Sequence, residues 1–228
     1  MKTVRFINKD RTQFASALKK NVNDYFKEAG ISQKANQHMV VKSLLLLSML
    51  IVPFILVLTL PANVWLIVLL SLIMGIGTAG IGMSVMHDAA HGSYSNNTLL
   101  NGFMAGTIYL LGGNLLTWKI QHNFLHHTYT NIEGMDEDIQ SKGVFRFSRH
   151  SEVKKIHRFQ HIYALFFYSL MTITKLPRDF FQLNVYNKSG ITLQQKVKPT
   201  IEYIIMAATK GFYLFLLIGL PILFTEYT

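Results

Sequence analysis

The 228-residue chain contains no cysteine, and this absence excludes several kinds of site at once. Without cysteine there is no disulfide, no thiolate metal site and no iron–sulfur cluster carried on this chain. Any metal that the chain binds must therefore be held by nitrogen and oxygen ligands.

Charge is absent from one long stretch of the chain. Lys and Arg total 22 and Asp and Glu total 12, yet none of them lies between Ser43 and Met86. A helix that crosses a bilayer needs about 20 apolar residues, so this stretch is long enough to cross twice. The Pro-Ala-Asn sequence at 61–63 predicts the turn of a helical hairpin. We therefore expect one membrane span at about 42–60 and a second at about 64–86.

The basic residues are unevenly distributed. Nine of the 22 precede Ser43, twelve lie between His87 and Thr200, one is Lys210, and the 61–63 turn carries none. This is the positive-inside pattern, in which basic segments stay in the cytoplasm and the turn is translocated. The net charge of +10 could indicate nucleic acid, but the basic residues are not interleaved with aromatic ones as in a single-strand binder. We therefore expect no nucleic acid as a partner.

Residues 1–42 are polar and basic with no early apolar core, so they do not resemble a signal peptide. Apolar side chains recur at helical spacing over 14–29 and predict an amphipathic helix, either on the membrane surface or against the region that carries the histidines. Asp10 with Gln13 fits a capping box for this helix. Ser32 is a candidate N-cap for the helix that leads into the first span.

Histidines form two clusters. His87 and His91 follow the second span in the sequence HDAAH, and residues four apart share a helix face with Cβ atoms roughly 5–6 Å apart. The alternative is a pair of interfacial histidines without a ligand role. His122 and His126 repeat this spacing, while His127 points about 100° away on an ideal helix. Imidazole suits iron, zinc and copper, and two such clusters beside a membrane surface predict a metal site.

The sequences around these clusters carry a family resemblance. The stretches HDAAHGSYS and WKIQHNFLHHTYTNIEGMDEDI resemble the first two histidine boxes of membrane fatty acid desaturases, and are most similar to the front-end acyl-CoA or acyl-lipid type. The resemblance implies a di-iron centre that activates O2 and removes two hydrogens from a long acyl chain. It also implies five iron ligands, here named the box histidines: His87, His91, His122, His126 and His127.

The implied chemistry fits such ligands. Breaking an unactivated C–H bond needs a strong metal-bound oxidant, which no side chain can supply. Neutral imidazoles are compatible with redox iron, and the carboxylates of Asp88, Asp136 and Asp138 are candidates to orient the rings. The alternative for Asp136 and Asp138 is a solvated acidic loop.

An electron donor and a substrate complete the reaction that the resemblance implies. The chain has no haem-binding or flavin motif, so two electrons must come from a partner protein, by resemblance a b-type cytochrome or a ferredoxin. The substrate is a fatty acyl-CoA or an acyl-lipid in the membrane. Two other functions stay open: a membrane di-iron hydroxylase or ketolase of lipids, and a non-enzymatic metal-binding membrane protein.

A third histidine box belongs to the family pattern near its C-terminus, but no histidine follows His161 in this sequence. Five histidines cannot complete two iron shells. We therefore expect this chain to be a truncated and inactive fragment.

Other motifs are weaker. The sequence GIGTAG at 75–80 matches GxGxxG, but it lies within a span, which indicates close helix packing by small residues rather than a nucleotide site. His157 and His161 form another pair four apart, which we interpret as part of an interfacial aromatic belt. His38 and His150 lie among polar residues and are expected to be exposed.

Both boxes must lie on one side of the membrane to share a metal. We therefore expect the glycine-rich segment 99–118 to be a broken or in-plane helix. The segment 158–174, which is basic at both ends, is expected to keep both ends in the cytoplasm. The segment 201–224 is expected to be a third span, in which Lys210 snorkels or marks a late entry.

The predicted fold is all-α and polytopic, with a transmembrane helical hairpin, interfacial helices and a cytoplasmic cap that carries the histidine-box metal site. We expect a single membrane desaturase domain, incomplete at its C-terminus, in four parts: a cytoplasmic amphipathic segment at 1–42, the transmembrane hairpin at 43–86, a cytoplasmic and interfacial catalytic region at 87–200, and the third span at 201–224.

Overall fold

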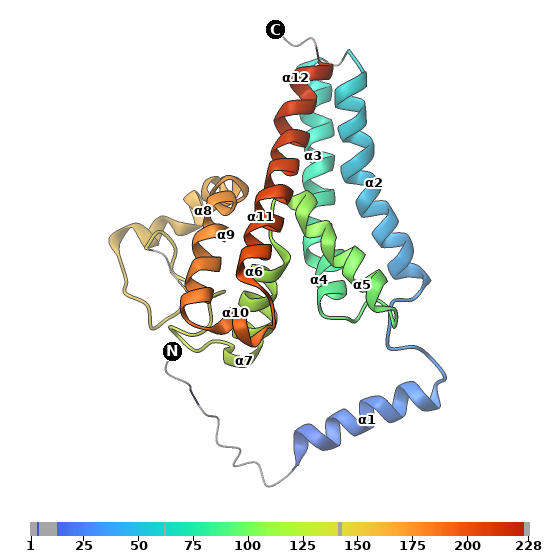
Figure 1. Cartoon of the computed structure of the whole chain (residues 1–228), viewed down its shortest axis with the longest axis vertical. Coiled ribbons are helices and arrows are strands. Elements are labelled where there is room, and N and C mark those ends of the chain that lie inside the picture. The colour runs from blue at the N-terminus through green and yellow to red at the C-terminus, as the bar shows by residue number, and fades with distance from the viewer. Residues whose placement is uncertain (1–3, 5–12, 62, 141–142, 226–228) are drawn as a thin grey trace.

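The computed structural model describes residues 4, 13–61, 63–140 and 143–225, and all regular secondary structure in this part of the chain is helical. Figure 1 shows three long helical rods side by side, with shorter helices gathered towards one of their ends. The predicted all-α fold is confirmed.

A helical hairpin forms the first membrane-embedded unit. Helix α2 (Gln37–Thr59) packs along α3 (Val64–Gly80), which continues through the π-helical turn η1 (Ile81–Val85) into α4 (Met86–Ala90). Both rods of this hairpin are long and apolar enough to cross a membrane. The predicted hairpin is confirmed, although α2 begins before the predicted start at about 42.

Asparagine side chains cap both helices of the hairpin. Asn36 accepts a hydrogen bond from a backbone N–H in the first turn of α2, and Asn63 does the same for α3. The prediction that Ser32 caps the first of these helices was wrong, because Ser32 instead accepts a bond within the preceding loop. At the start of α1, Gln13 is left-handed and its side chain makes no capping bond, while Asp10 lies outside the described residues.

Helix α1 (Phe14–Glu28) is the predicted amphipathic helix, and it lies apart from the bundle in Figure 1. The large apolar side chains of Phe14, Leu18, Val22 and Tyr25 are exposed. This face therefore does not pack against the region that carries the histidines. Of the two predicted positions, the membrane surface is the one that would cover it.

Small residues bring the two helices of the hairpin together. A Cβ atom at Gly77 would lie 2.9 Å from the backbone nitrogen of Leu50 and 3.0 Å from the carbonyl oxygen of Leu46. The backbones approach so closely that no side chain fits there, as in other small-residue contacts between membrane helices. The packing role predicted for the GIGTAG sequence is confirmed.

A third rod completes the membrane-embedded part. It consists of α11 (Pro199–Leu214), the π-helical turn η5 (Phe215–Gly219) and α12 (Leu220–Phe224). Within the described ranges, three helices meet the length and apolarity of a membrane span, or four if one sharply bent pair is counted as a span. This rod is one of the three, as predicted for 201–224.

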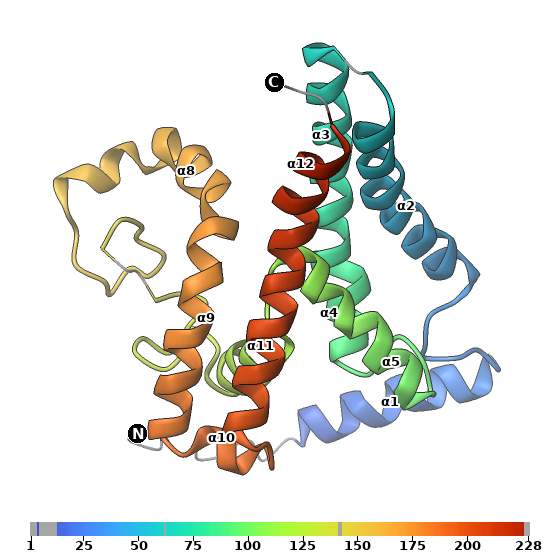
Figure 2. The same cartoon turned by 45° about the horizontal axis from the view of Figure 1, so that its top comes forward.

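Shorter helices precede this rod. They are η4 (Lys155–Phe159), α8 (Gln160–Ser169), α9 (Met171–Lys188) and α10 (Ile191–Gln194). The segment 158–174 is therefore divided between three elements, with a break at Leu170, and is not one of the three span-length helices. Figure 2 shows α9 beside the lower part of α11.

The segment between the two histidine clusters is a broken helix, as predicted. Its first half is α5 (Thr98–Ala105) with the 3-10 helix η2 (Gly106–Leu111). Its second half is α6 (Leu115–Lys119), the π-helical η3 (Ile120–His126) and α7 (His127–Tyr129). The two halves are bent by 108° relative to each other.

The bend depends on Gly112 and on contacts with α11. Gly112 has a φ of 71°, and a Cβ atom there would lie 2.9 Å from the ring of Tyr213. Asn114 caps α6 by accepting a bond from the Thr117 N–H, and its amide donates to Glu202 at 2.9 Å. Backbone conformation and α11 together fix the direction in which the second half leaves the bend.

Lys210 is buried, which contradicts the prediction that it snorkels or marks a late entry. Its ammonium group pairs with Asp179 of α9 at 2.8 Å and donates to the carbonyl of Gly112 at 3.0 Å. An opposite charge and a free carbonyl within reach remove the need for the side chain to extend to water. The pairing of Lys210 with a residue of α9 was not predicted from the sequence.

Candidate metal centre

The two histidine clusters meet in space although 35 residues separate His87 from His122. The Nε2 atoms of these two residues are 3.2 Å apart. The ring centroid of His91 lies 4.6 Å from that of His87 and 4.9 Å from that of His127, and His126 stacks on His122 at 5.1 Å. The five box histidines, predicted as one group, lie together in the structure.

The path of the chain explains why the two histidine clusters lie close together. The second rod of the hairpin carries His87 to its lower end on α4, and the 108° bend returns η3 to the same place. The side-chain amide of Asn123 on η3 donates to the carbonyl of Ala90 at 3.1 Å and ties the two elements together. Two segments that are distant in sequence thus present their imidazoles to one another.

A π-helical turn that was not predicted precedes His127. On an ideal α-helix this ring would point about 100° away from its neighbour. In the structure the backbone N–H of His127 donates to the carbonyl of His122, five residues earlier, so the turn is wider than in an α-helix. The His127 ring consequently lies 4.9 Å from that of His122, centroid to centroid.

Carboxylates face the Nδ1 atoms of three box histidines. Nδ1 of His87 lies 3.1 Å from Asp88, and Nδ1 of His122 lies 3.1 Å from Asp138. Nδ1 of His126 lies 3.0 Å from Asp136 and 3.5 Å from Asp138. The three predicted aspartates therefore all contact a box histidine. The solvated-loop alternative fails for Asp136, which is fully buried.

Backbone donors hold Asp136 in its charged form. Burial alone would raise the pKa of its carboxyl, but N–H groups of Asn131 (2.8 Å) and Asp138 (3.0 Å), together with the His126 ring, outweigh burial and lower the pKa. The next residue, Glu137, accepts a hydrogen bond from the hydroxyl of Tyr186 on α9 at 2.8 Å. Hydrogen bonds within the acidic loop and a hydrogen bond from α9 therefore hold the loop in place.

Ring nitrogens of four box histidines have the spacing of ligands that share a metal, whereas His127 joins neither of the two groups found in the described residues. Two nitrogens bound to one ion at about 2.0–2.1 Å lie roughly 3.0–3.4 Å apart, and the 3.2 Å between His87 and His122 falls in this range. Ligand atoms of His87, His91 and His122 all lie within 4.8 Å of one another. So do those of His122, His126 and Asp138, which makes Asp138 a possible ligand as well as an orienting group.

Burial and neighbouring rings favour the neutral form of two box histidines, because they lower the pKa of His91 and His122. Partial burial lowers the pKa of His91, and the neighbouring rings of His87, His127 and His122 lower it further. A neutral ring keeps a lone pair for a metal, whereas a protonated ring does not.

Trp118 belongs to the cluster but was not predicted from the sequence. Its ring stacks on that of His122 at 4.7 Å and meets the rings of His87 and His91 edge-on at 5.8 and 6.0 Å. Its spacing of four residues before His122 was the available signal, because such residues share a helix face. Trp118 covers one side of the imidazoles with an apolar surface.

The remaining histidines lie elsewhere. His38 and His150 are exposed, as predicted. Nδ1 of His157 accepts a hydrogen bond from a backbone N–H of its own turn. In the part of the chain that the structure describes, neither His157 nor His161 joins a group with the spacing of metal ligands.

The chain is similar to known proteins over most of its length. Residues 63–226 match a family model described as fatty acid desaturase. No solved structure matches the chain significantly.

Several characterised proteins are similar to this chain. The sn-1 linoleoyl-lipid 6-desaturase of Synechocystis sp. is 32% identical over 214 residues, which cover 92% of this chain and 58% of that protein. The enzyme of the same description from Arthrospira platensis is 33% identical over 68% of this chain and 42% of its own length. An acyl-lipid (8-3)-desaturase of Physcomitrium patens is 28% identical over 96% of this chain and 46% of its length. The chain thus spans about half the length of these relatives.

Proposed function

This chain belongs to the fatty acid desaturase family, and we propose that it contributes to an acyl-lipid desaturase in which the five box histidines hold iron. The observation that carries the proposal is the convergence of two separated clusters, with the Nε2 atoms of His87 and His122 at 3.2 Å. A chance encounter of interfacial histidines would not also supply a carboxylate at Nδ1 of three rings.

Iron suits the donor set. Imidazole is among the ligands that iron accepts, and a shell of neutral nitrogens is compatible with a change of redox state. When bound, iron would activate O2 and supply the oxidising strength that cleavage of an unactivated C–H bond requires. Two electrons would come from a partner protein, for which a b-type cytochrome or a ferredoxin is the expected class.

The side chains around the box histidines would prepare them for this task. The carboxylates of Asp88, Asp136 and Asp138 bind Nδ1, fix the orientation of each ring and leave Nε2 for the metal. Trp118 covers the imidazoles from one side and limits the access of water. Asn123 holds η3 against α4, so that the two boxes keep their distance.

The proposed substrate is an acyl chain attached to a membrane lipid. The three relatives described above are named for reactions on acyl-lipids, and this chain is similar to each of them over at least 68% of its length. The structure supports a membrane-borne substrate, because the box histidines lie at the end of rods that are apolar enough to cross a bilayer. The proposed product is the same lipid with one additional double bond.

The proposed location of the site is the cytoplasmic face of the membrane. In Figure 1 the connection between α2 and α3 lies at one end of the rods, and α4, α6 and α7 lie towards the other. The end with the box histidines adjoins the basic segments, while the 61–63 turn has no basic residue. This distribution supports a cytoplasmic site by the positive-inside rule.

Expression of a full-length protein that contains this chain and a third histidine box, in a host whose membrane lipids include linoleoyl chains, tests the proposed reaction. Mass spectrometry of total acyl chains should show products lighter by two hydrogens, and His126→Ala should abolish them without loss of membrane insertion. His126 lies in η3, outside the three span-length rods, so its loss should remove a ligand and leave the fold intact. A product heavier by one oxygen would instead indicate a hydroxylase. Unchanged products in the His126→Ala variant would contradict the proposal.

A further inference from the structure

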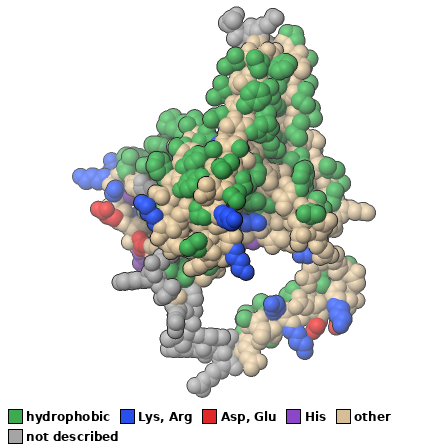
Figure 3. Space-filling view, in the orientation of Figure 1, with side chains coloured by type: hydrophobic (Ala, Val, Ile, Leu, Met, Phe, Trp, Pro, Cys, Tyr) green, Lys and Arg blue, Asp and Glu red, His purple; other side chains and the backbone are tan. Residues whose placement is uncertain are grey.

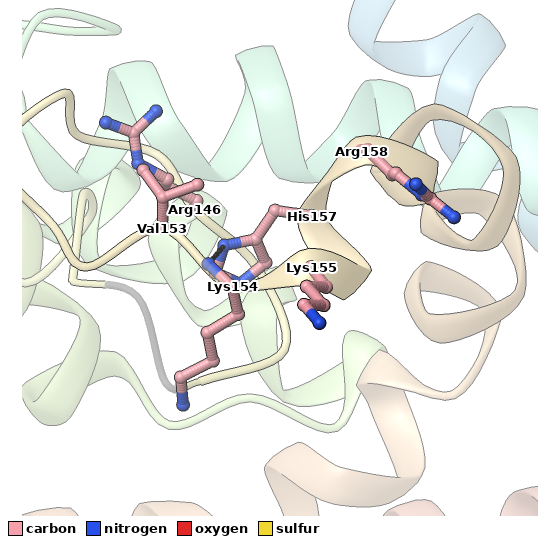
Figure 4. Close-up of a pocket in the computed structure, with 6 residues that line it drawn as sticks. All are labelled: Arg146, Val153, Lys154, Lys155, His157 and Arg158. Carbon is pink, nitrogen blue, oxygen red and sulfur yellow. Dashed lines mark hydrogen bonds between the residues drawn. The ribbon is translucent and has the colours of Figure 1, made fainter.

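We propose that a basic pocket beside α8 binds the phosphate headgroup of an anionic membrane lipid. The pocket is a hollow of about 430 Å³ lined by Arg146, Val153, Lys154, Lys155, His157 and Arg158, and it is here named the basic pocket. Figure 4 shows these residues around the turn of η4 and the preceding loop. A hollow of this size is within the range of small-ligand sites, roughly 300–1,000 Å³.

Positive charge in the basic pocket is not neutralised by the protein. Within the described residues, none of its Lys and Arg side chains forms an ion pair with a carboxylate. The only acidic neighbour in the sequence 143–160 is Glu152. Four cationic groups around one hollow attract an anion, and phosphate is the anion for which Arg and Lys are best suited.

Several contacts hold the basic pocket in shape. Arg146 donates to the carbonyls of Ser151 (3.0 Å) and Arg149 (2.6 Å), and the guanidinium of Arg158 lies 4.5 Å from the centre of the Phe159 ring. The backbone N–H of Lys154 donates to Nδ1 of the adjacent His157 at 3.1 Å. Because these bonds form within the protein, an anion would enter a preformed site.

An exposed apolar face lies next to the basic pocket. Ile162, Leu165 and Phe166 on α8 are 65%, 78% and 62% exposed. On a neighbouring face, the half-buried Tyr163 donates its hydroxyl to the carbonyl of Val144 at 2.6 Å. In Figure 3 hydrophobic side chains cover the upper part of the lobe on the left, and Lys and Arg side chains lie along its left and lower parts. Such an arrangement is typical of helices that lie in a membrane interface.

The exposed apolar face of α8 favours a lipid as the source of the phosphate. Helix α9, which directly follows α8, is tied to the third rod by the ion pair between Asp179 and Lys210. The lobe that carries the basic pocket is therefore attached to a helix of membrane-span length. A lipid whose acyl chains cover the apolar face of α8 would place its headgroup at the adjacent basic pocket, whereas a soluble phosphate compound has no acyl chain to cover that face.

A fluorescent reporter on α8 tests the proposal on the full chain. The chain has no cysteine, so Leu165→Cys gives one attachment site for an environment-sensitive dye. The detergent-purified protein is titrated with phosphatidylglycerol, with phosphatidylcholine and with inorganic pyrophosphate. We expect phosphatidylglycerol alone to give a saturable blue shift. A basic residue near an anionic lipid surface changes the affinity by about 5-fold.

Charge variants show whether the basic pocket is responsible. Lys154→Gln, Lys155→Gln and Arg158→Gln combined should weaken the response to phosphatidylglycerol on the order of 100-fold. The charge-conserving set Lys154→Arg, Lys155→Arg and Arg158→Lys should restore it. A matched control removes three exposed lysines from a different region and should leave the response unchanged: Lys188→Gln, Lys196→Gln and Lys198→Gln.

Three results would overturn the proposal. Equal responses to phosphatidylglycerol and phosphatidylcholine would show that the headgroup charge is not recognised. Equal weakening by the control set would show a general charge effect. Saturation by pyrophosphate, with loss of the response to lipid, would assign the basic pocket to a soluble phosphate compound.

Discussion

At the scale of single residues, the two nitrogens of an imidazole ring have different roles in the candidate centre. Carboxylates contact Nδ1 of three box histidines, and the Nε2 atoms of His87 and His122 face each other. This arrangement fixes the tautomer and raises the basicity of the ligand nitrogen. In the proposed centre the aspartates would therefore influence the metal although they lie behind the rings.

Asp136→Asn tests the orienting role at the most buried of these carboxylates. The amide keeps the size of the side chain but loses the charge that binds His126 and two backbone N–H groups. We expect the affinity for iron to fall by about 10- to 100-fold, measured by equilibrium binding of Fe(II) to the purified protein. Glu133→Gln, an exposed change in the same loop, is the control. Equal affinities in both variants would refute the role assigned to Asp136.

The sequence predicted which residues form the cluster better than it predicted how their side chains are arranged. Spacing and flanking sequence identified the five box histidines, and all of them lie together. The π-helical turn of η3, and with it the approach of the His127 ring to 4.9 Å from that of His122, was not predicted. Trp118 was missed because an aromatic residue at helical spacing is more often part of a core. Side-chain contacts between distant segments had no local signal to reveal them.

At the scale of elements, the break between η2 and α6 determines where the second box lies. Glycines and Asn114 in the sequence predicted this break, but not its angle of 108°. The angle depends on contacts with α11, and these are visible only once the chain is folded. Elements with strong local signals were therefore predictable, while their relative directions were not.

Gly112→Ala tests the break directly. A side chain at this position would require a left-handed conformation and would also meet the Tyr213 ring at 2.9 Å. We expect a loss of about 1–3 kcal/mol in the free energy of unfolding, measured by thermal or denaturant unfolding in detergent. Gly102→Ala in α5, where a Cβ atom meets open space, should be neutral or slightly stabilising. Similar losses in the two variants would refute the special role of Gly112.

The buried ion pair makes a second prediction at this scale. Lys210→Met should leave Asp179 charged and unpaired, and should cost about 3–5 kcal/mol of unfolding free energy. The double variant Lys210→Met with Asp179→Leu removes both charges and should recover most of that loss. Unfolding of the two single variants and the double variant measures their coupling. Additive losses would show that the two side chains do not form the pair described here.

At the scale of the whole molecule, three rods anchor a cap of short helices that carries the box histidines. The bilayer dictates the hairpin, because a charge-free run of this length has no other stable surroundings. The sequence therefore predicted the hairpin and the third rod well. It did not predict that α9 would pair with the third rod through Asp179 and Lys210.

Membrane orientation is tested by labelling single cysteines in the otherwise cysteine-free chain. Lys188→Cys lies at the exposed end of α9 and should be protected from an impermeant reagent added outside intact cells. Val64→Cys, exposed beside the turn of the hairpin, should react. The reverse pattern would place the box histidines outside the cytoplasm and refute the proposed orientation.

Iron binding by single histidine variants tests the central claim most directly. The purified protein is loaded with Fe(II), desalted and assayed for retained iron. We predict that alanine at any of the five box histidines lowers the retained iron, while His38→Ala and His150→Ala retain as much as the unaltered protein. Undiminished iron in the His87→Ala and His122→Ala variants, or an equal loss in the two controls, would contradict a metal centre formed by the two boxes.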